Sequence, residues 1–260
     1  MWYDSDPRTM RRYSSPYASS ISFGPGPLST AIKALIGANV AVFVLMSVLP
    51  YQAERVLTEL LGLVPARVVH LWVWQLVTYM FLHGGLFHIL FNMLALWMFG
   101  AELERIWGTR DFLKFYFVTG AGAGLLTVFF SLLPFGFAQQ LYGSVVIGAS
   151  GAIYGLLLAY ALYFPDRPIY MYLVFPIPAK VFVMIMGAIA FYSSLSQAGG
   201  VANATHLGGL AVGYFYLKGA RIHPLAEVKY RYLKWKMSRA RRKFDVHAGG
   251  RNDGWNGRIH

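Results

Sequence analysis

Four long stretches of this chain contain no Asp, Glu, Lys or Arg. They run from Ala34 to Ala53, from Val68 to Ala101, from Phe115 to Pro165 and from Val181 to Leu217. A helix that crosses a bilayer needs about 20 apolar residues, so the first two stretches have room for one span each and the last two for two spans each. The pattern therefore predicts six membrane-spanning helices, at residues 28–49, 85–99, 111–133, 145–164, 179–195 and 202–217.

The segments between these helices are also informative. Residues 51–82 are too apolar for a free loop, and we expect them to lie partly in the membrane interface. The stretch IYMYLVFPIP, residues 169–178, alternates like a strand, but its prolines favour an interfacial loop. The predicted organisation is a polar arm at residues 1–27, a six-span core at 28–222 and a basic, partly disordered tail at 223–260. The expected fold class is an all-α polytopic membrane protein.

Composition supports a membrane protein over a soluble one. Hydrophobic residues make up 57% of the 260 residues and charged residues only 13%, whereas soluble domains carry roughly 25% charged residues. The N-terminal arm has no short apolar stretch followed by a small-residue cleavage site, so we expect the first span to remain as an anchor. The chain has no cysteine, which excludes disulfides, thiolate catalysis and cysteine metal sites.

The net charge of +12 is distributed as the positive-inside rule expects. With six spans and both termini on one side, only Arg55 and Arg67 of the 23 Lys and Arg residues lie on the opposite side. We therefore expect cytoplasmic termini. The tail interleaves aromatic and basic residues, so it either only fixes the topology or also binds anionic lipid headgroups. We do not expect it to bind nucleic acid.

A few polar side chains lie in or near the apolar spans: His83, His88, Asn92, Ser150, Asn203 and His206. Such groups are costly in a bilayer and usually face the interior of a bundle. Spans 2, 4 and 6 all enter from the outer face. His88, Ser150 and His206 are each placed one to two turns into their helix, which is roughly 5–10 Å below the surface. Three helices thus bring polar groups to one level, which indicates a shared site.

The residue types at this level fit nucleophilic catalysis. A serine hydroxyl becomes a good nucleophile when a base such as histidine takes its proton, which would pair Ser150 with His206. The developing oxyanion needs donors, and Asn92, His88 and the backbone N–H of Ser150 can supply them. Gly148 and Gly151 would let other backbone approach the serine. No acidic residue lies at that depth, so the site would be a Ser-His dyad.

Three segments resemble the signature segments of the rhomboid intramembrane serine proteases. They are GASG with a tyrosine four residues after the serine, HGGLFHILFN, and NATHLGGLAVG. The resemblance covers about residues 30–220 in the family's order. It implies a rhomboid-like bundle and an intramembrane serine endopeptidase that hydrolyses peptide bonds in or near transmembrane segments of membrane proteins.

The resemblance also implies roles for single residues. Ser150 would be the nucleophile and His206 the general base, with His88 and Asn92 in the oxyanion hole. Tyr154 matches the tyrosine that packs beside the catalytic histidine. Glu104 matches an acidic residue at the inner end of span 2, and Trp74 matches the tryptophan of a Trp-Arg pair that orients the family's outer loop. Gln75 departs from the arginine of that pair. By resemblance, span 5 is a candidate substrate gate.

Other readings of the same residues stay open at this stage. Ser150 and the glycines around it also suit close helix packing, His206 could be a buried histidine or part of a proton path, and His88 with Asn92 could join two helices. The protein could be a rhomboid relative that binds membrane clients, a small transporter or channel, or an acyl-chain hydrolase.

We expect no metal and no cofactor. His83 and His88 are five residues apart, a spacing that does not align on one helical face for zinc, and His83 fits a structural or interfacial role. The six-span core and the absence of a transit-like N-terminus favour a bacterial inner membrane, with the active site opening to the outer face.

Overall fold

A computed structural model describes residues 27–134, 136–171, 175–195 and 200–221. In chain order its elements are α1 (Thr30–Val48), α2 (Tyr51–Leu61), α3 (Pro65–Val68), α4 (Gln75–Thr78), the 3-10 helix η2 (Tyr79–Phe81), α5 (Leu86–Trp107), α6 (Thr109–Ser131), α7 (Gly136–Gly143), α8 (Ser150–Tyr163), β1 (Pro168–Met171), β2 (Phe175–Pro178), α9 (Ala179–Leu195) and α10 (Gly200–Arg221). The chain divides into residues 1–216 and 217–260, and the description below concerns the first unit.

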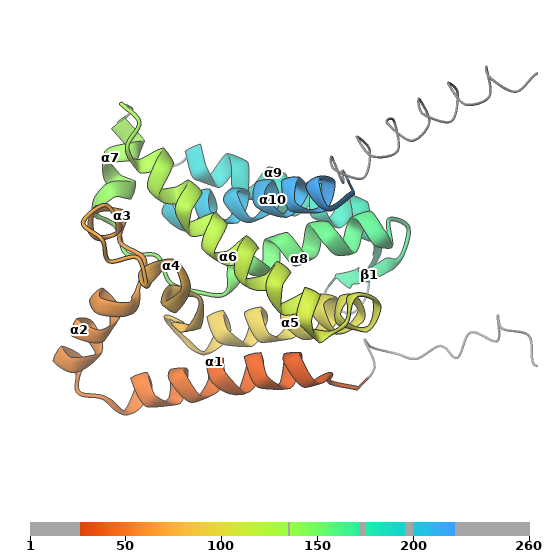
Figure 1. Ribbon diagram of the computed structural model, residues 1–260, viewed down its shortest axis with the longest axis horizontal. Helices are drawn as coiled ribbons and strands as arrows, with labels where there is room; N and C mark the ends of the chain where they lie inside the picture. Colours follow the sequence, from red (N-terminus) through yellow and green to blue (C-terminus); the bar gives the residue numbers. More distant parts are fainter. Residues whose placement is uncertain (1–26, 135, 172–174, 196–199, 222–260) are drawn as a thin grey trace, which may run out of the picture. The chain divides into compact units, whose positions relative to one another are not determined.

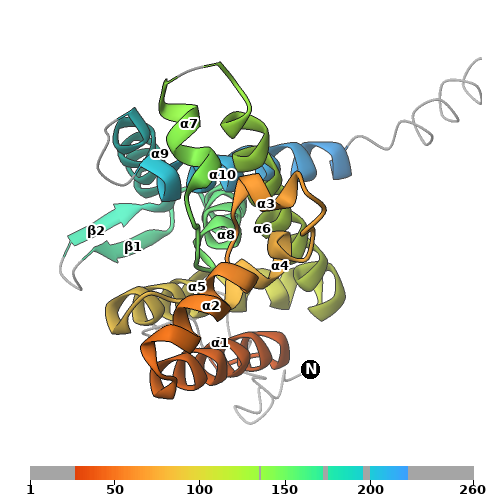
Figure 2. The same cartoon turned by 90° about the vertical axis from the view of Figure 1, so that its left-hand side faces the viewer.

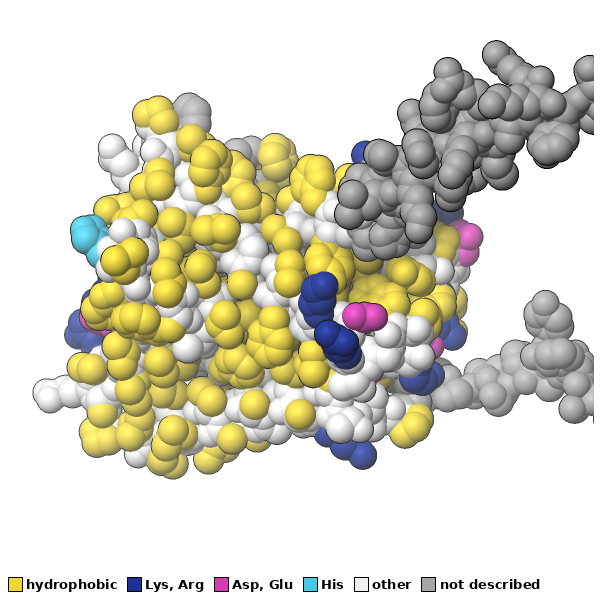
Figure 3. Space-filling model, viewed as in Figure 1, with side chains coloured by type: hydrophobic (Ala, Val, Ile, Leu, Met, Phe, Trp, Pro, Cys, Tyr) yellow, Lys and Arg dark blue, Asp and Glu magenta, His cyan; other side chains and the backbone are white. Residues whose placement is uncertain are grey.

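Within the described residues, three helices are long and apolar enough to cross a membrane. They are α1, α5 and α6, and the two shorter helices α8 and α9 are also apolar along their length. Large hydrophobic side chains stay exposed on these helices, including Leu45 of α1 and Phe91 of α5. In Figure 3 hydrophobic side chains are spread over most of the face shown, and the charged side chains form a few small groups. The mostly helical, apolar fold agrees with the prediction, while three candidate spans within the described residues do not confirm the six predicted.

The helix α8 is the centre of the bundle. It packs against α5, α6 and α9, and its residues from Gly151 to Leu157 are all buried. Helix α1 lies beside α5 on the outside of this group, as Figures 1 and 2 both show. A helix that is apolar all round is buried by its neighbours, and α8 fits that rule.

The predicted start of the fourth span is wrong. Helix α8 begins at Ser150 instead of near residue 145, so the serine is the first helical residue and not one to two turns inside. Two features keep the preceding residues extended. Val146 and Leu63 exchange two backbone hydrogen bonds, of 2.8 and 2.9 Å. Gly148 then adopts φ +122°, a conformation that glycine tolerates and other residues rarely adopt.

The interpretation of residues 169–178 as a loop is also wrong. Strands β1 and β2 form an antiparallel hairpin in which Pro168 faces Pro178 and Tyr170 faces Pro176. Proline is tolerated at the start of a strand and on edge strands. In a sheet of two strands both are edges, so the prolines that argued against a strand are compatible with one. The hairpin leads directly into α9.

Several other boundaries follow the prediction closely. Helix α9 covers the predicted residues 179–195, and α6 differs from its prediction by two residues at each end. Helix α5 continues to Trp107, eight residues beyond the predicted end, and thereby carries the buried Glu104. Residues 51–82, which were expected to be more than a free loop, contain α2, α3, α4 and η2. The predictions for residues 1–26 and for the tail at 223–260 lie outside the described residues.

Candidate active site

Ser150 and His206 meet at the centre of the bundle. The hydroxyl oxygen of Ser150 lies 2.8 Å from Nε2 of His206, although 56 residues separate them in sequence. Ser150 opens α8 and His206 lies in α10. The distance is that of a good hydrogen bond, so the structure brings together the two residues that the sequence analysis paired.

Close contact between the backbones of α8 and α10 makes this distance possible. A Cβ at Gly209 would collide with the carbonyl oxygen of Gly151, and one at Gly213 would lie 3.1 Å from Cα of Gly155. Glycines therefore occupy both sides of the crossing, as small-residue helix contacts require. The packing interpretation of these glycines and the pairing of Ser150 with His206 describe one arrangement.

Tyr154 supports the His206 ring from one side. The two rings are stacked, with centroids 4.2 Å apart and planes inclined by 5°. Tyr154 follows Ser150 by one helical turn on α8, so the same helix carries the serine and the support of the histidine. This is the contact that the sequence analysis expected of Tyr154.

Gly148 lies directly against the imidazole ring of His88. A Cβ at Gly148 would sit 2.8 Å from Nε2 of His88 and 3.7 Å from Oγ of Ser150. Because Gly148 has no side chain and tolerates a positive φ, the backbone can pass close to the His88 ring at this position. His88 therefore lies close to the backbone just before the serine, with its Nδ1 accepting a hydrogen bond of 3.3 Å from the N–H of Gly84.

Asn92 lies one turn beyond His88 on α5. Its side chain is buried, and its Nδ2 donates a hydrogen bond of 2.9 Å to the carbonyl of His88. The remaining expected donor is the backbone N–H of Ser150. The first N–H groups of a helix have no partner within the helix, and Ala149 provides no side-chain cap. This helix start also carries a partial positive charge.

Tyr79 holds the backbone just before Ser150 in place, and the sequence analysis did not identify it. Its carbonyl accepts a hydrogen bond of 2.9 Å from the N–H of Gly148. Its hydroxyl donates one of 2.8 Å to the carbonyl of Gly120, and a Cβ at Gly151 would lie 2.8 Å from that hydroxyl. Nothing in the local sequence distinguishes this tyrosine, because its contacts come from α6 and α8.

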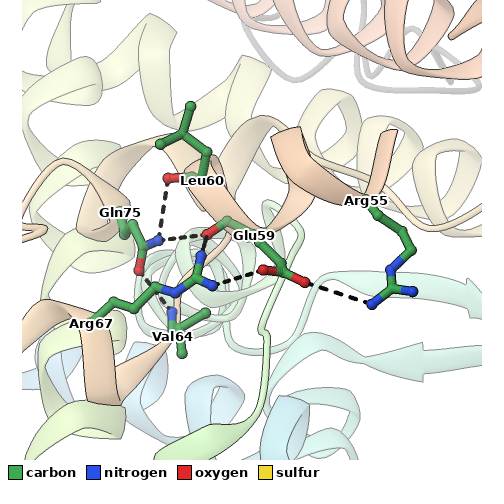
Figure 4. Close-up of polar contacts among 6 residues, drawn as sticks. All are labelled: Arg55, Glu59, Leu60, Val64, Arg67 and Gln75. Carbon is green, nitrogen blue, oxygen red and sulfur yellow. Dashed lines mark hydrogen bonds and ion pairs between the residues drawn. The ribbon is translucent and has the colours of Figure 1, made fainter. Parts of the chain in front are cut away.

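Gln75, the departure from the family's Trp-Arg pair, is fully buried in the outer loop. Its amide nitrogen donates to the carbonyls of Glu59 and Leu60, and its amide oxygen accepts a hydrogen bond of 3.0 Å from the N–H of Val64 (Figure 4). Nε1 of Trp74 donates to the carbonyl of Leu60 as well. The neutral amide thus ties the end of α2 to the start of α4.

Arg67 adds a charged contact to the same loop. Its guanidinium binds the Glu59 carboxylate, with nitrogen and oxygen 2.7 Å apart, and also donates to the Glu59 carbonyl (Figure 4). It lies 4.9 Å from the ring centroid of Trp72. An arginine therefore does stabilise this loop, from a position eight residues before Gln75.

The structure also places three further residues that were singled out from sequence. His83 is buried against His88, with ring centroids 5.0 Å apart. Glu104 accepts hydrogen bonds from Ser29, from the N–H of Ala31 and from Thr109, so it joins the starts of α1 and α6. Asn203 lies in α10. Among the described residues, no group of three or more His, Cys, Asp or Glu could hold a metal ion.

Two comparisons with known proteins bear on these residues. The Rhomboid domain family model matches residues 70–221, a range that contains Gln75, His88, Ser150 and His206. Rhomboid protease GlpG of Pectobacterium atrosepticum is 30% identical over 78% of this chain and 65% of its own length. Rhomboid protein 1, mitochondrial, of Saccharomyces cerevisiae is 30% identical over 71% and 51%.

Rhomboid protease GluP of Bacillus subtilis is 34% identical over 55% of this chain and 25% of its own length. The chain thus spans between a quarter and about two thirds of the curated relatives it matches. The family that the sequence motifs indicated is confirmed by the matched domain.

Proposed function

Since this chain belongs to the rhomboid family, we propose that it is an intramembrane serine endopeptidase. It hydrolyses peptide bonds in or near transmembrane segments of other membrane proteins, with Ser150 and His206 as a catalytic dyad. The observation that carries this proposal is the 2.8 Å distance between Ser150 Oγ and His206 Nε2 inside an apolar bundle. Relatives named as rhomboid proteases support the same chemistry.

In the proposed reaction, His206 takes the proton of the Ser150 hydroxyl while the oxygen attacks the peptide carbonyl. His206 then gives the proton to the leaving amine. Water hydrolyses the acyl-enzyme, with His206 again as the base. The stacked ring of Tyr154 keeps the imidazole of His206 in the plane that this exchange needs.

The oxyanion is stabilised in this proposal by donors around the first turn of α8. The backbone N–H of Ser150 and the helix start supply fixed positive polarity. The His88 ring, which lies beside Gly148, and the amide of Asn92 supply side-chain donors. These groups are held in place before the substrate binds, and such preorganisation is what makes oxyanion donors effective.

The proposed setting is a bacterial inner membrane, with both termini in the cytoplasm and the site opening to the outer face. Substrates are transmembrane proteins that enter from the lipid side and unwind near their outer end. The basic tail contacts anionic lipid headgroups. No cofactor and no nucleic acid take part.

Covalent labelling with a fluorophosphonate tests this proposal in detergent solution. We expect rapid labelling of wild type and no labelling of Ser150→Ala. His206→Ala should be labelled at least about 100-fold more slowly, since a general base contributes 10²–10⁴-fold. His70→Ala is the matched control, because His70 is exposed in the outer loop. Wild-type protein that is folded yet unlabelled would overturn the proposal.

A further inference from the structure

Among the residues that the structure describes, the His206 ring has no third residue of the kind that usually orients a catalytic histidine. Its Nδ1 is buried and has no hydrogen-bond partner within the part of the chain that the structure describes. The sequence has no acidic residue between Asp111 and Asp166 or between Asp166 and Glu227. In triads an acid on Nδ1 fixes the orientation of the imidazole, so the orientation here has another source.

A stack with Tyr154 fixes the plane of the His206 ring but does not fix the rotation of α10 about its own axis. The glycine contacts of α10 do not fix it fully either. Gly208 lies against Ala123 and Gly209 against Gly151, and such van der Waals contacts set the distance between helices without a directional bond. Each side chain of a helix points in its own direction from the axis, about 100° from that of the next residue. A rotation of α10 about its axis therefore turns His206 Nε2 away from Ser150 Oγ.

A directional contact does hold α10 next to His206. The hydroxyls of Thr205 in α10 and Thr127 in α6 lie 2.8 Å apart. Thr127 is fully buried and Thr205 is 1% exposed. Thr127 is itself fixed by a hydrogen bond of 2.9 Å with the carbonyl of Ala123 in its own helix. Thr205 immediately precedes His206, so this hydrogen bond anchors α10 to α6 next to the proposed base.

We propose that the Thr127–Thr205 hydrogen bond sets the rotation of α10 and thereby holds His206 Nε2 on Ser150 Oγ. The two threonines are positioning residues for the reaction, and this inference rests on the proposed function. They replace the orienting acid of a triad with a hydrogen bond between side chains, made by the residue next to His206 on α10. Thr205 touches Gly151 as well, since a Cβ there would lie 3.2 Å from its methyl group.

The test uses valine, which has nearly the shape of threonine without the hydroxyl. Fluorophosphonate labelling of the full chain is measured as a first-order rate at saturating probe and as the probe concentration for half-maximal rate. Thr127→Val and Thr205→Val should each lower the saturated rate about 10-fold, because a small misplacement of reacting groups is costly. The half-maximal concentration should not change. The double variant should be no slower than the slower single variant.

Two further variants separate positioning from general stability. Thr119→Val is the matched control, because Thr119 is also fully buried in α6 but bonds the carbonyls of Phe115 and Tyr116 in its own helix. Thr127→Ser keeps the hydroxyl and should recover most of the wild-type rate. The melting temperature of every variant is measured alongside, so that only folded protein is compared.

Two results would contradict the proposals, and they can be told apart. Labelling of both valine variants at the rate of Thr119→Val, even with a lowered melting temperature, would overturn the positioning role and leave the proposed function intact. An unlabelled wild type would instead overturn the proposed function itself, and this inference with it.

Discussion

At the scale of single residues, the sequence was most informative where polar side chains are rare. His88, Asn92, Ser150 and His206 stand out because polar groups are unusual in apolar spans, and the structure places His206 on Ser150 and His88 beside Gly148. Tyr79 and Gln75 could not be found in this way, since their importance comes from partners distant in sequence. Thr127 and Thr205 were not singled out either, because other hydroxyl residues such as Thr119 lie in the same charge-free segments and only the structure pairs these two.

Acid should destabilise the fold through His83. Burial, and secondly the neighbouring His88, lower the pKa of His83 from 6.5 to about 4. The unfolded chain therefore binds a proton that the folded protein excludes between these values. Stability from the neutral ring is complete above pH 6.5 and is lost as the pH falls toward 4.

Melting temperatures across that pH range check this expectation. The wild-type value should fall more steeply with acid than that of His83→Gln. His70→Gln, at an exposed position, should keep the wild-type slope. Equal slopes for all three proteins would contradict the assignment to His83.

At the scale of elements, helices were predicted well where a run of apolar residues had clear ends. Helix α9 follows Pro178 and was predicted to the residue. The start of α8 was not, because Val146 pairs with Leu63 and Gly148 takes a positive φ, and neither contact can be read from the apolar run itself. The hairpin was missed because proline was weighed without knowing that both strands are edges.

The outer loop should depend on Gln75. Replacement by alanine removes the hydrogen-bond partner of the buried Val64 N–H, at a cost of about 1–3 kcal/mol. It also removes one of the two donors to each of the Glu59 and Leu60 carbonyls. We expect a lower melting temperature for Gln75→Ala, whereas Gln52→Ala, on the exposed side of α2, should match wild type. Similar melting temperatures for the two variants would show that Trp74 and Arg67 suffice to hold the loop.

At the scale of the whole molecule, the matched domain settles the family, and the charge pattern predicts the orientation. The absence of cysteine allows a direct check, because a single introduced thiol has no background. Leu71 is 79% exposed in the outer loop, and Arg110 is exposed at the start of α6.

A membrane-impermeant maleimide should label Leu71→Cys in intact bacterial cells. It should label Arg110→Cys only after the inner membrane has been made permeable, because that end of α6 is expected to face the cytoplasm. The reverse pattern would invert the proposed topology. The substrate would then have to approach from the cytoplasmic side.

The glycine crossing of α8 and α10 has a consequence for how the protein responds to perturbation. Where two backbones touch, as at Gly151 and Gly209, no side chain remains that could shift to absorb a change. Helices α8 and α10 can therefore either stay in contact or separate, and packed elements of this kind change between discrete positions. Heat or altered bilayer thickness should therefore leave turnover almost untouched up to a threshold, and then abolish it within a narrow interval.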